Sequence, residues 1–364
     1  MSDPAYVALA LVPGVGRVRF ETLLHAFGSA DAVLSASFKQ LRALRGISPA
    51  AATAISTTTP ELGTKTLERV AAQDGVALTP TDPEFPSILT QIPDAPVLLF
   101  ARGRLELLPT SCVAIVGSRD HSRYGAEVAA HLASGCARAG VTVVSGMARG
   151  LDAVAHDAAL DAGGGTVGVL GNGLGVVYPA AHRALYDRVV VDGCLLTEYP
   201  PGERPSAGSF PRRNRLISGL SKATVIVEAG VGSGALITAD CALSQGRDVM
   251  AVPGPITSGV SAGTNRLIQM GAKPVLELND VLEEYGLSDV PDVSLPSDLS
   301  DAERRMLEAL NDGAELVDDV TARLACPAAE ALAVLTSLEI RGLVAQEPGK
   351  IFRPAKPFDV SRKP

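Results

Sequence analysis

The sequence predicts an α/β protein built on a doubly wound, mostly parallel sheet. Between residues 111 and 280, short apolar runs rich in Val, Ile and Leu alternate with helical stretches of small residues. Continuous apolar strands separated by helices are typical of a parallel sheet that is covered on both faces. The chain has 364 residues, of which 46% are hydrophobic and 20% charged. This composition is that of a folded chain of two or three domains, so the central domain is expected to be Rossmann-like.

The strands and helices of the central domain, 111–280, can be assigned in order. Strands are expected at Cys112–Val116, Val141–Ser145, Thr166–Leu170, Leu195–Glu198, Val225–Glu228, Val249–Val252 and Pro274–Leu276. Helices are expected at 124–139, 153–162, 234–245 and 265–270. A Pro-rich connecting region, 61–110, precedes this domain and leads into the sheet through a strand at Val97–Phe100.

The N-terminal segment, 1–60, contains a short internal repeat. The pattern of Leu9–Gly16 recurs at Leu41–Ser48: each copy ends an apolar helix, makes a turn of small residues and starts a second amphipathic stretch. The pattern resembles a tandem helix-hairpin-helix or SAM-like module, in which a glycine turn lets backbone N–H groups approach a phosphate. A small helical packing domain fits the same pattern, and the sequence leaves both interpretations open.

The C-terminal part is expected to be an acidic linker, 281–298, followed by a winged-helix-like domain, 299–356. Residues 277–303 hold nine acidic residues and no Lys or Arg. Helices are expected at 300–311, 316–324 and 327–341, followed by a hairpin through 343–345 and 351–353. The last helix has one Arg and two Glu, so it is poorly suited to enter a major groove. A packing or protein-interaction role is expected for this domain.

The overall charge and the cysteines restrict the function and the compartment. A net charge of −8 argues, taken alone, against a nucleic-acid partner. The five cysteines are far apart and form no CxxC pair, as expected of reduced thiols in the cytoplasm. No apolar run reaches the length of a membrane span, and the apolar N-terminal stretch lacks the preceding basic residues of a signal peptide. A cytoplasmic protein without a membrane partner is expected.

Glycine-rich loops follow four of the predicted strands, at 117–120, 145–150, 171–174 and 230–234. The carboxyl ends of parallel strands meet at one crevice, where exposed backbone amides favour an anion. A dinucleotide is disfavoured because no GxGxxG motif is present and the second strand ends without an acidic residue. The residues expected to bind the anion are Gly117, Ser118, Arg119, Gly146, Arg149, Gly232, Ser233 and Gly234.

The segment Pro201–Lys222 has a local charge of +4 in this acidic chain. Pro200–Pro211 is rich in Pro, Gly and Ser, so it is expected to be a loop that exposes Phe210. This combination suits single-stranded nucleic acid, because the arginines can hold phosphates while the aromatic ring stacks on unpaired bases. A solvated basic loop, or a docking site for an acidic partner, remains the alternative.

Signals for catalysis are few. The five histidines have no metal-ligand spacing, and neither a GxSxG elbow nor a P-loop GKS/T motif occurs. Asp152 and His156 share one face of the expected helix, where a salt bridge or a helix cap explains them. No catalytic residue, metal or cofactor is therefore expected.

A series of ordered motifs in about 80–280 resembles the DNA-processing protein A family (DprA/Smf). The motifs are Gly117–Arg119, Ser145–His156, Gly171–Leu174 with Tyr178-Pro179 and His182, Glu198–Gly202, Phe210–Ser221, Ser233–Ala239, Gly246–Gly254 and Gly263–Ala272. The resemblance implies a non-catalytic protein that binds single-stranded DNA, protects incoming strands in natural transformation and helps to load the RecA recombinase, usually as a homodimer.

The resemblance also assigns roles to residues. It places phosphate contacts at Gly117, Ser118 and Arg119, and a basic DNA-binding stretch at Arg204, Phe210, Arg212, Arg213, Asn214 and Arg215. It places the dimer and RecA surface at about Ile237–Gln245 and Asn265–Met270. Within that surface Leu267, Ile268 and Met270 could form the contact, or could be buried in the core.

Two other functions are weighed against DNA binding. Nucleoside-monophosphate phosphoribohydrolases share the fold and need a catalytic Glu after a glycine-rich loop, but Leu236 stands at that place here. A regulatory adaptor that works through its helical ends without binding DNA is the other alternative.

Overall fold

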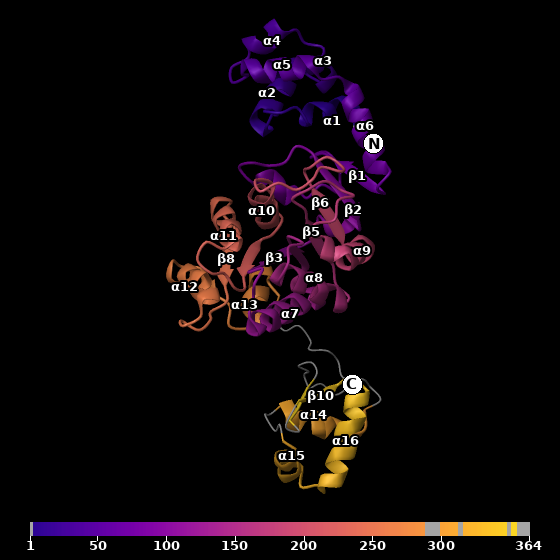
Figure 1. Cartoon of the computed structure of the whole chain (residues 1–364), viewed down its shortest axis with the longest axis vertical. Helices are drawn as coiled ribbons and strands as arrows, with labels where there is room; N and C mark the ends of the chain where they lie inside the picture. Colours follow the sequence, from indigo (N-terminus) through magenta and orange to yellow (C-terminus); the bar gives the residue numbers. More distant parts are fainter. Residues whose placement is uncertain (1–2, 288–298, 312–315, 348–350, 355–364) are drawn as a thin grey trace. The chain divides into compact units, whose positions relative to one another are not determined.

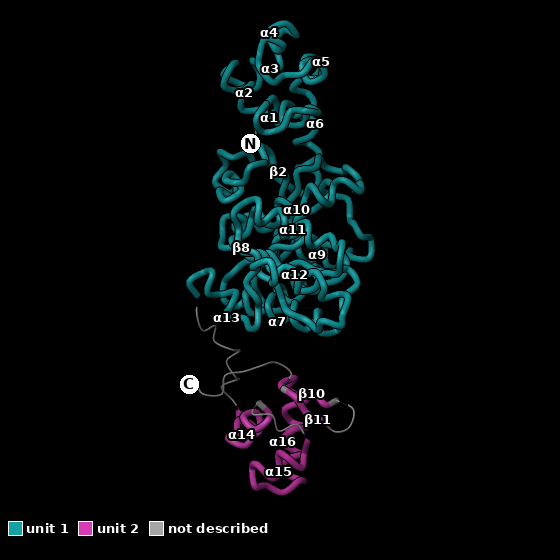
Figure 2. The backbone as a smooth tube through the Cα atoms, turned by 90° about the vertical axis from the view of Figure 1, so that its left-hand side faces the viewer, with its two compact units in different colours: residues 1–288 teal, residues 289–364 magenta. Residues whose placement is uncertain are grey.

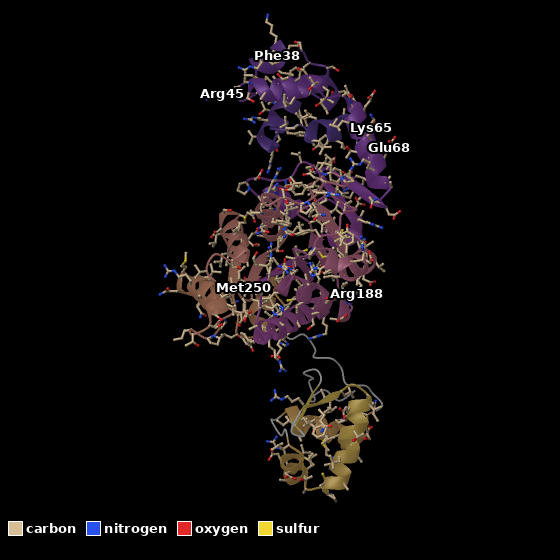
Figure 3. The ribbon with its side chains drawn as sticks, viewed as in Figure 1. Phe38, Arg45, Lys65, Glu68, Arg188 and Met250 are labelled. Carbon is tan, nitrogen blue, oxygen red and sulfur yellow. The ribbon has the colours of Figure 1, made fainter. Side chains whose placement is uncertain are left out.

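The computed structural model describes residues 3–287, 299–311, 316–347 and 351–354. They form two compact units, Met1–Ser288 and Asp289–Pro364, coloured teal and magenta in Figure 2. The first unit contains a nine-stranded sheet with helices around it (Figure 1). In its interior Met250 is fully buried, whereas Arg188 lies at the surface and pairs with Asp157 (Figure 3).

The sheet has the strand order β1-β2-β6-β5-β4-β3-β7-β8-β9. The strands are β1 (Gly75–Leu78), β2 (Leu99–Gly103), β3 (Cys112–Val116), β4 (Thr142–Ser145), β5 (Thr166–Val169), β6 (Cys194–Thr197), β7 (Ala223–Ile226), β8 (Asp248–Ala251) and β9 (Lys273–Pro274). Strands β3 to β9 are parallel, and β1 and β2 add an antiparallel edge. After β6 the chain crosses β3 to place β7 on its other side, which creates the switch point where ligands bind in such sheets.

Helices cover the sheet between its strands. They are α7 (Arg123–Arg138), α8 (Leu151–Asp161), α9 (Arg183–Asp192), α10 (Ser209–Gly219), α11 (Gly234–Ser244), α12 (Ala262–Gln269) and α13 (Leu278–Leu282). Short 3-10 helices are η1 (Ser87–Gln91), η2 (Leu105–Leu107), η3 (Ala180–His182), η4 (Gly259–Ser261) and η5 (Glu283–Tyr285). Helix α7 packs against α8, and α10 packs against α11. The predicted fold class is therefore confirmed.

The basic segment differs from its prediction. It is helical from Ser209 onward, so Phe210 and Arg212 lie on α10 and not on an exposed loop. Pro211 does not prevent this helix because it lies in the first turn, where its missing N–H would have no intrahelical partner. The composition of 200–211 predicted a loop, and only the part before Ser209 is one.

The N-terminal helices form their own small core around Phe20, Leu23 and Leu41. They are α1 (Pro4–Ala10), α2 (Arg17–Phe27), α3 (Ala30–Leu34), α4 (Phe38–Ala43), α5 (Pro49–Thr57) and α6 (Pro60–Ala71). Arg19 donates to the carbonyl oxygens of both turn glycines, Gly14 at 2.6 Å and Gly46 at 2.9 Å. Because this arginine is used to join the two turns, the packing role is favoured over phosphate binding.

The second unit has three helices and a hairpin. They are α14 (Asp301–Asn311), α15 (Val317–Leu324), α16 (Ala328–Ile340), β10 (Val344–Glu347) and β11 (Ile351–Pro354). The linker prediction was wrong at its start, because Val281 and Leu282 are buried in α13 and Lys273 pairs with Glu283 and Glu284. Residues 288–298 lie outside the described part of the chain. Among the described residues, no helix combines the length and the apolar character that a membrane span needs.

Candidate nucleic-acid interface

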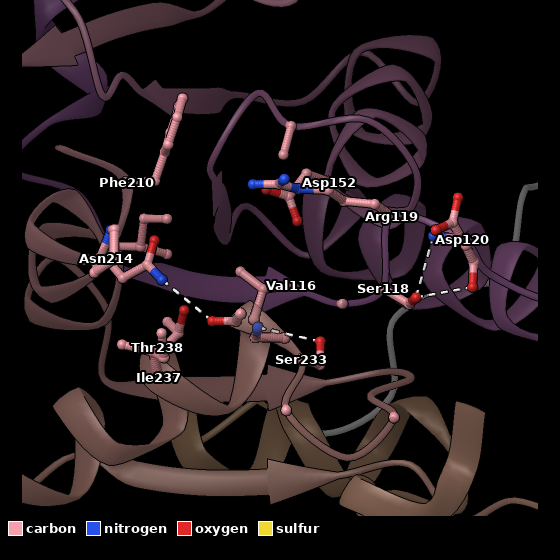
Figure 4. A pocket seen from close by; sticks show the side chains of 18 of the residues that line it. Val116, Ser118, Arg119, Asp120, Asp152, Phe210, Asn214, Ser233, Ile237 and Thr238 are labelled. Atoms are coloured by element: carbon pink, nitrogen blue, oxygen red, sulfur yellow. Dashed lines mark hydrogen bonds between the residues drawn. The ribbon is translucent and has the colours of Figure 1, made fainter. Parts of the chain in front are cut away.

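Two adjoining pockets lie at the carboxyl ends of the parallel strands. The larger, of about 760 Å³, lies between the loops that follow β3 and β7 (Figure 4). The smaller, of about 320 Å³, lies beside the loops that follow β4 and β5. Both are lined by Arg119, Ala148, Phe210 and Arg213. The four predicted glycine-rich loops thus contribute to one continuous crevice.

Hydrogen bonds fix the loop after β3. The Ser118 amide donates to the carbonyl oxygen of Glu228 at 2.8 Å, and the Ser118 hydroxyl donates to the Asp120 carbonyl at 2.8 Å. The buried carboxylate of Glu228 accepts from the Ser122 amide at 2.9 Å. Gly150 has φ +82° and lies so close that a Cβ there would come within 2.4 Å of the Ser118 carbonyl oxygen. The loops after β3 and β4 therefore support each other.

Arg119 extends from this loop toward two aromatic rings. Its guanidinium lies 5.8 Å from the centroid of the Phe210 ring, which lies 5.3 Å from the Tyr178 ring at an interplanar angle of 33°. Within the described part of the chain, Arg119 forms no ion pair with Asp120, Asp152 or another acidic residue. Its charge is available to a ligand in the crevice.

The remaining predicted basic residues differ in their surroundings. Arg149, Arg204 and Arg212 are exposed. Arg215 is paired internally with Glu198 at 2.6 Å and with Asp94 at 3.0 Å. The expected group of free arginines is thus smaller than predicted, because successive positions of a helix point in different directions.

Arg213 lies inside the molecule, with only 5% of its surface exposed. Its guanidinium donates to the carbonyl oxygens of Gly146 and Val169 and, at 3.2 Å, to the side chain of Asn214. Burial lowers its pKa to about 10, and the carboxylate of Asp152 opposes this effect. Asn214 is also buried, and it donates to the Gly234 carbonyl at 3.3 Å.

Asp152 and His156 are both buried below the crevice. Asp152 accepts from the Gly146 amide at 3.1 Å, and burial raises its pKa even though Arg213 opposes this. His156 bonds to the Thr166 hydroxyl at 2.7 Å and accepts from the Met147 amide at 3.4 Å. Burial, reinforced by Arg213, lowers its pKa to about 3, so the imidazole is neutral. The two side chains hold the loop after β4 and do not pair with each other.

The loop after β7 leads directly into α11. The Ser233 hydroxyl accepts from the Ala235 amide at 3.4 Å and caps the helix. Gly232 has φ +77°, a backbone conformation that favours glycine. Gly232, Ser233 and Gly234 line the larger pocket, so the positive end of the α11 dipole borders the crevice.

The residues expected at a dimer and RecA surface are not equally accessible. Ile237 and Met270 are exposed, Met270 by 67%. Leu267 is 8% exposed and belongs to the core, and Ile268 packs partly against it. Asn265 is bonded to both backbone groups of Gly254. Leu243, inside the predicted range Ile237–Gln245, is exposed, and so is Leu276, which lies outside both predicted ranges.

Two site residues were missed by the sequence analysis. Tyr178 was recognised only within a motif, although a Tyr-Pro pair close to a glycine-rich loop could have indicated an aromatic wall. Glu228 was treated only as the last residue of a strand. An acidic residue that ends an apolar strand could have indicated a group that holds a neighbouring loop. The structure places Tyr178 in the smaller pocket and Glu228 behind the Ser118 loop.

Comparisons with known proteins agree with this arrangement. Residues 76–286 match the family described as DNA recombination-mediator protein A, and residues 290–350 match the DprA winged helix domain. The chain is 41% identical to Protein Smf of Escherichia coli (strain K12) over 296 residues, which cover 78% of this chain and 79% of that protein. It is 47% identical to DNA processing protein DprA of Streptococcus pneumoniae over 201 residues, 55% of this chain and 71% of that protein.

Two solved structures are similar to this chain. The X-ray structure of DNA processing protein A from Streptococcus pneumoniae matches with a TM-score of 0.68 and 37% identity, over 78% of this chain and 99% of that one. DNA processing protein A from Helicobacter pylori, whose structure concerns its single-stranded DNA binding mode, matches with a TM-score of 0.53 and 28% identity, over 58% and 95%. The predicted resemblance is confirmed, and the chain belongs to the DNA recombination-mediator protein A family.

Proposed function

We propose that this protein binds single-stranded DNA in the crevice formed by the two pockets. The observation that carries the proposal is the row of Arg119, Phe210 and Tyr178 beside the glycine-rich loops. A guanidinium can hold a phosphate while an adjacent ring stacks on a base, a combination that suits unpaired strands. The single-stranded DNA binding mode described for the Helicobacter pylori structure supports the same ligand.

Several groups are proposed to contact the phosphates. The Gly117–Arg119 loop and the α11 N-terminus face the larger pocket, and Arg149 lines the smaller one. Arg204 and Arg212 are exposed on the basic segment. Their charges are proposed to attract DNA to this face in spite of the acidic total.

We further infer a role in natural transformation, with protection of incoming strands and loading of RecA by a homodimer. Family membership supports this role. Leu243 on α11 and Met270 at the end of α12 are exposed apolar side chains for a partner, whereas Ile237, also exposed, lines the larger pocket. A cytoplasmic location goes with such a role.

We infer that the protein acts by binding and not by catalysis. Leu236 takes the place of the carboxylate that a phosphoribohydrolase would need, and it packs partly against the core. Free base released from nucleoside monophosphates would contradict this inference. A regulatory adaptor would instead capture RecA while failing to bind DNA even at low salt.

Replacement of Arg119 by alanine tests the proposed site. The Arg119→Ala variant should bind a single-stranded oligonucleotide about tenfold more weakly, because it loses a charge-assisted contact. The slope of log affinity against log salt concentration should also fall by about 0.7. Both are measured by fluorescence anisotropy over a salt series.

Arg104→Ala is the matched control. Arg104 is also surface-exposed, and it lies at the amino ends of the strands, where it pairs with Glu106. This variant should bind like the wild type. An unchanged affinity in Arg119→Ala, with its fold intact, would show that the strand binds elsewhere.

A further inference from the structure

Gly146 is held from two sides by buried charged groups. The Arg213 guanidinium donates to its carbonyl oxygen at 2.5 Å, and the Asp152 carboxylate accepts from its amide at 3.1 Å. Arg213 also donates to the Val169 carbonyl, at the end of β5. One side chain of α10 therefore joins the ends of β4 and β5.

This arrangement uses three of the five N–H donors of Arg213, those on Nε and Nη1. The residue lines both pockets, but it is 5% exposed, and within the described part of the chain its hydrogen bonds go to protein acceptors. A phosphate contact through Nε or Nη1 would leave buried acceptors unpaired, which is costly. With 5% of the residue exposed, Nη2 has little access to a strand. Arg212, the preceding residue on the same helix, is exposed.

We propose that Arg213 is a positioning residue, which fixes the Gly146–Arg149 loop and the floor shared by the two pockets without contacting phosphate. The proposal rests on the proposed function, and it makes Arg212 the phosphate contact and its neighbour Arg213 the support for the loop. DNA binding depends on Arg213 because the loop it holds presents Arg149 to the smaller pocket.

Gly146 offers a second way to disturb the same contacts. A Cβ at this position would lie 2.6 Å from Asp152 Oδ2 and 2.7 Å from Arg213 Nη2. The φ of Gly146 lies outside the left-handed region, so alanine suits its backbone conformation. Gly146→Ala therefore pushes Asp152 and Arg213 away from the loop while every charge is kept.

The first experiment compares Arg212→Gln with Arg213→Gln in the full chain. Affinity for a single-stranded oligonucleotide is measured over a salt series, below the unfolding temperature of each variant. Arg212→Gln should lower the salt slope by about 0.7, as the loss of one phosphate contact does. Arg213→Gln should weaken binding by about tenfold or more and leave the salt slope at its wild-type value.

The second experiment uses Gly146→Ala, which also decides the matter if Arg213→Gln does not fold. It should weaken binding with an unchanged salt slope. Gly16→Ala is the matched control, because a Cβ at Gly16 would meet no atom within 4 Å and the residue lies among the N-terminal helices. This control should bind like the wild type.

Two results would overturn the proposal. One is a salt slope in Arg213→Gln that falls as in Arg212→Gln, which would make Arg213 a phosphate contact. The other is wild-type affinity in Gly146→Ala. If the wild-type chain bound no single-stranded DNA, the proposed function itself would fail, and this proposal with it.

Discussion

Adjacent arginines in this protein have opposite surroundings. Arg212 is exposed, whereas Arg213 is buried and bonded to backbone carbonyls of two strand ends. Arg119 differs again, since its guanidinium lies over an aromatic ring. Identical side chains therefore differ in what they can reach, depending on where the backbone places them.

Acid should destabilise the fold through His156. Its pKa is about 3 in the folded protein, against the ordinary value of 6.5. Above pH 6.5 its imidazole is neutral in both states and the contribution to stability is complete. As the pH falls toward 3, only the unfolded chain takes up the proton. The free energy of unfolding therefore falls by about 1.4 kcal/mol for each pH unit between the two pKa values.

The His156→Gln variant isolates this contribution. The wild type and the variant share the other titratable groups around this position, which are Asp152, Arg213 and His182. Urea unfolding from about pH 7 to about pH 4 should therefore show a smaller loss of unfolding free energy in the variant. Equal losses in the two proteins would show that His156 is not buried as a neutral group.

At the residue scale, the sequence predicted which loops form the crevice but not which arginines are free. Gly117, Gly146 and Gly232 follow apolar strands, and a glycine after an apolar run can be recognised in the sequence. The burial of Arg213 depends on the rotation of α10, and that helix was not predicted. The internal pairing of Arg215 with Asp94 joins residues far apart in the chain, which no local pattern shows.

At the scale of elements, the strands were predicted best. Six of the seven predicted strands of the central domain exist as continuous apolar runs buried on both faces. The seventh is only the two-residue β9, which overlaps the predicted Pro274–Leu276 at Pro274 and leaves Leu276 exposed. Helix α10 was missed because Pro211 and the four polar residues that follow it interrupt the apolar pattern typical of a helix. Strand β1 and helix α9 were missed because their patterns are short or mixed, and tertiary packing stabilises them.

The end of α12 provides a test of the proposed homodimer. Met270 is exposed, so Met270→Asp should leave the fold intact while placing a charge in an apolar contact. Light scattering should then show the monomer mass at concentrations where the wild type is dimeric, and capture of RecA should fall. Val191→Asp, at an exposed apolar position on α9, should change neither result. A dimer that survives Met270→Asp would place the contact on another surface.

At the scale of the whole molecule, the net charge of −8 misrepresents the crevice. Nine acidic residues lie in 277–303, whereas Pro201–Lys222 has a charge of +4. Helix α16 of the second unit has no Lys or Arg and two Glu, so this helix lacks the positive charge that a DNA-recognition helix uses. The acidic total favours solubility, and the exposed Arg204 and Arg212 of Pro201–Lys222 are the charges that we propose attract DNA.

The affinity for single-stranded and duplex oligonucleotides of equal length, measured over a salt series, tests the central claim most directly. The glycine-rich crevice and the ring of Phe210 need unstacked bases, so the single strand should bind more tightly at every salt concentration. Its log affinity should fall linearly with log salt concentration. Tighter binding of the duplex, or an affinity that does not change with salt, would contradict the proposal that this crevice holds a single strand.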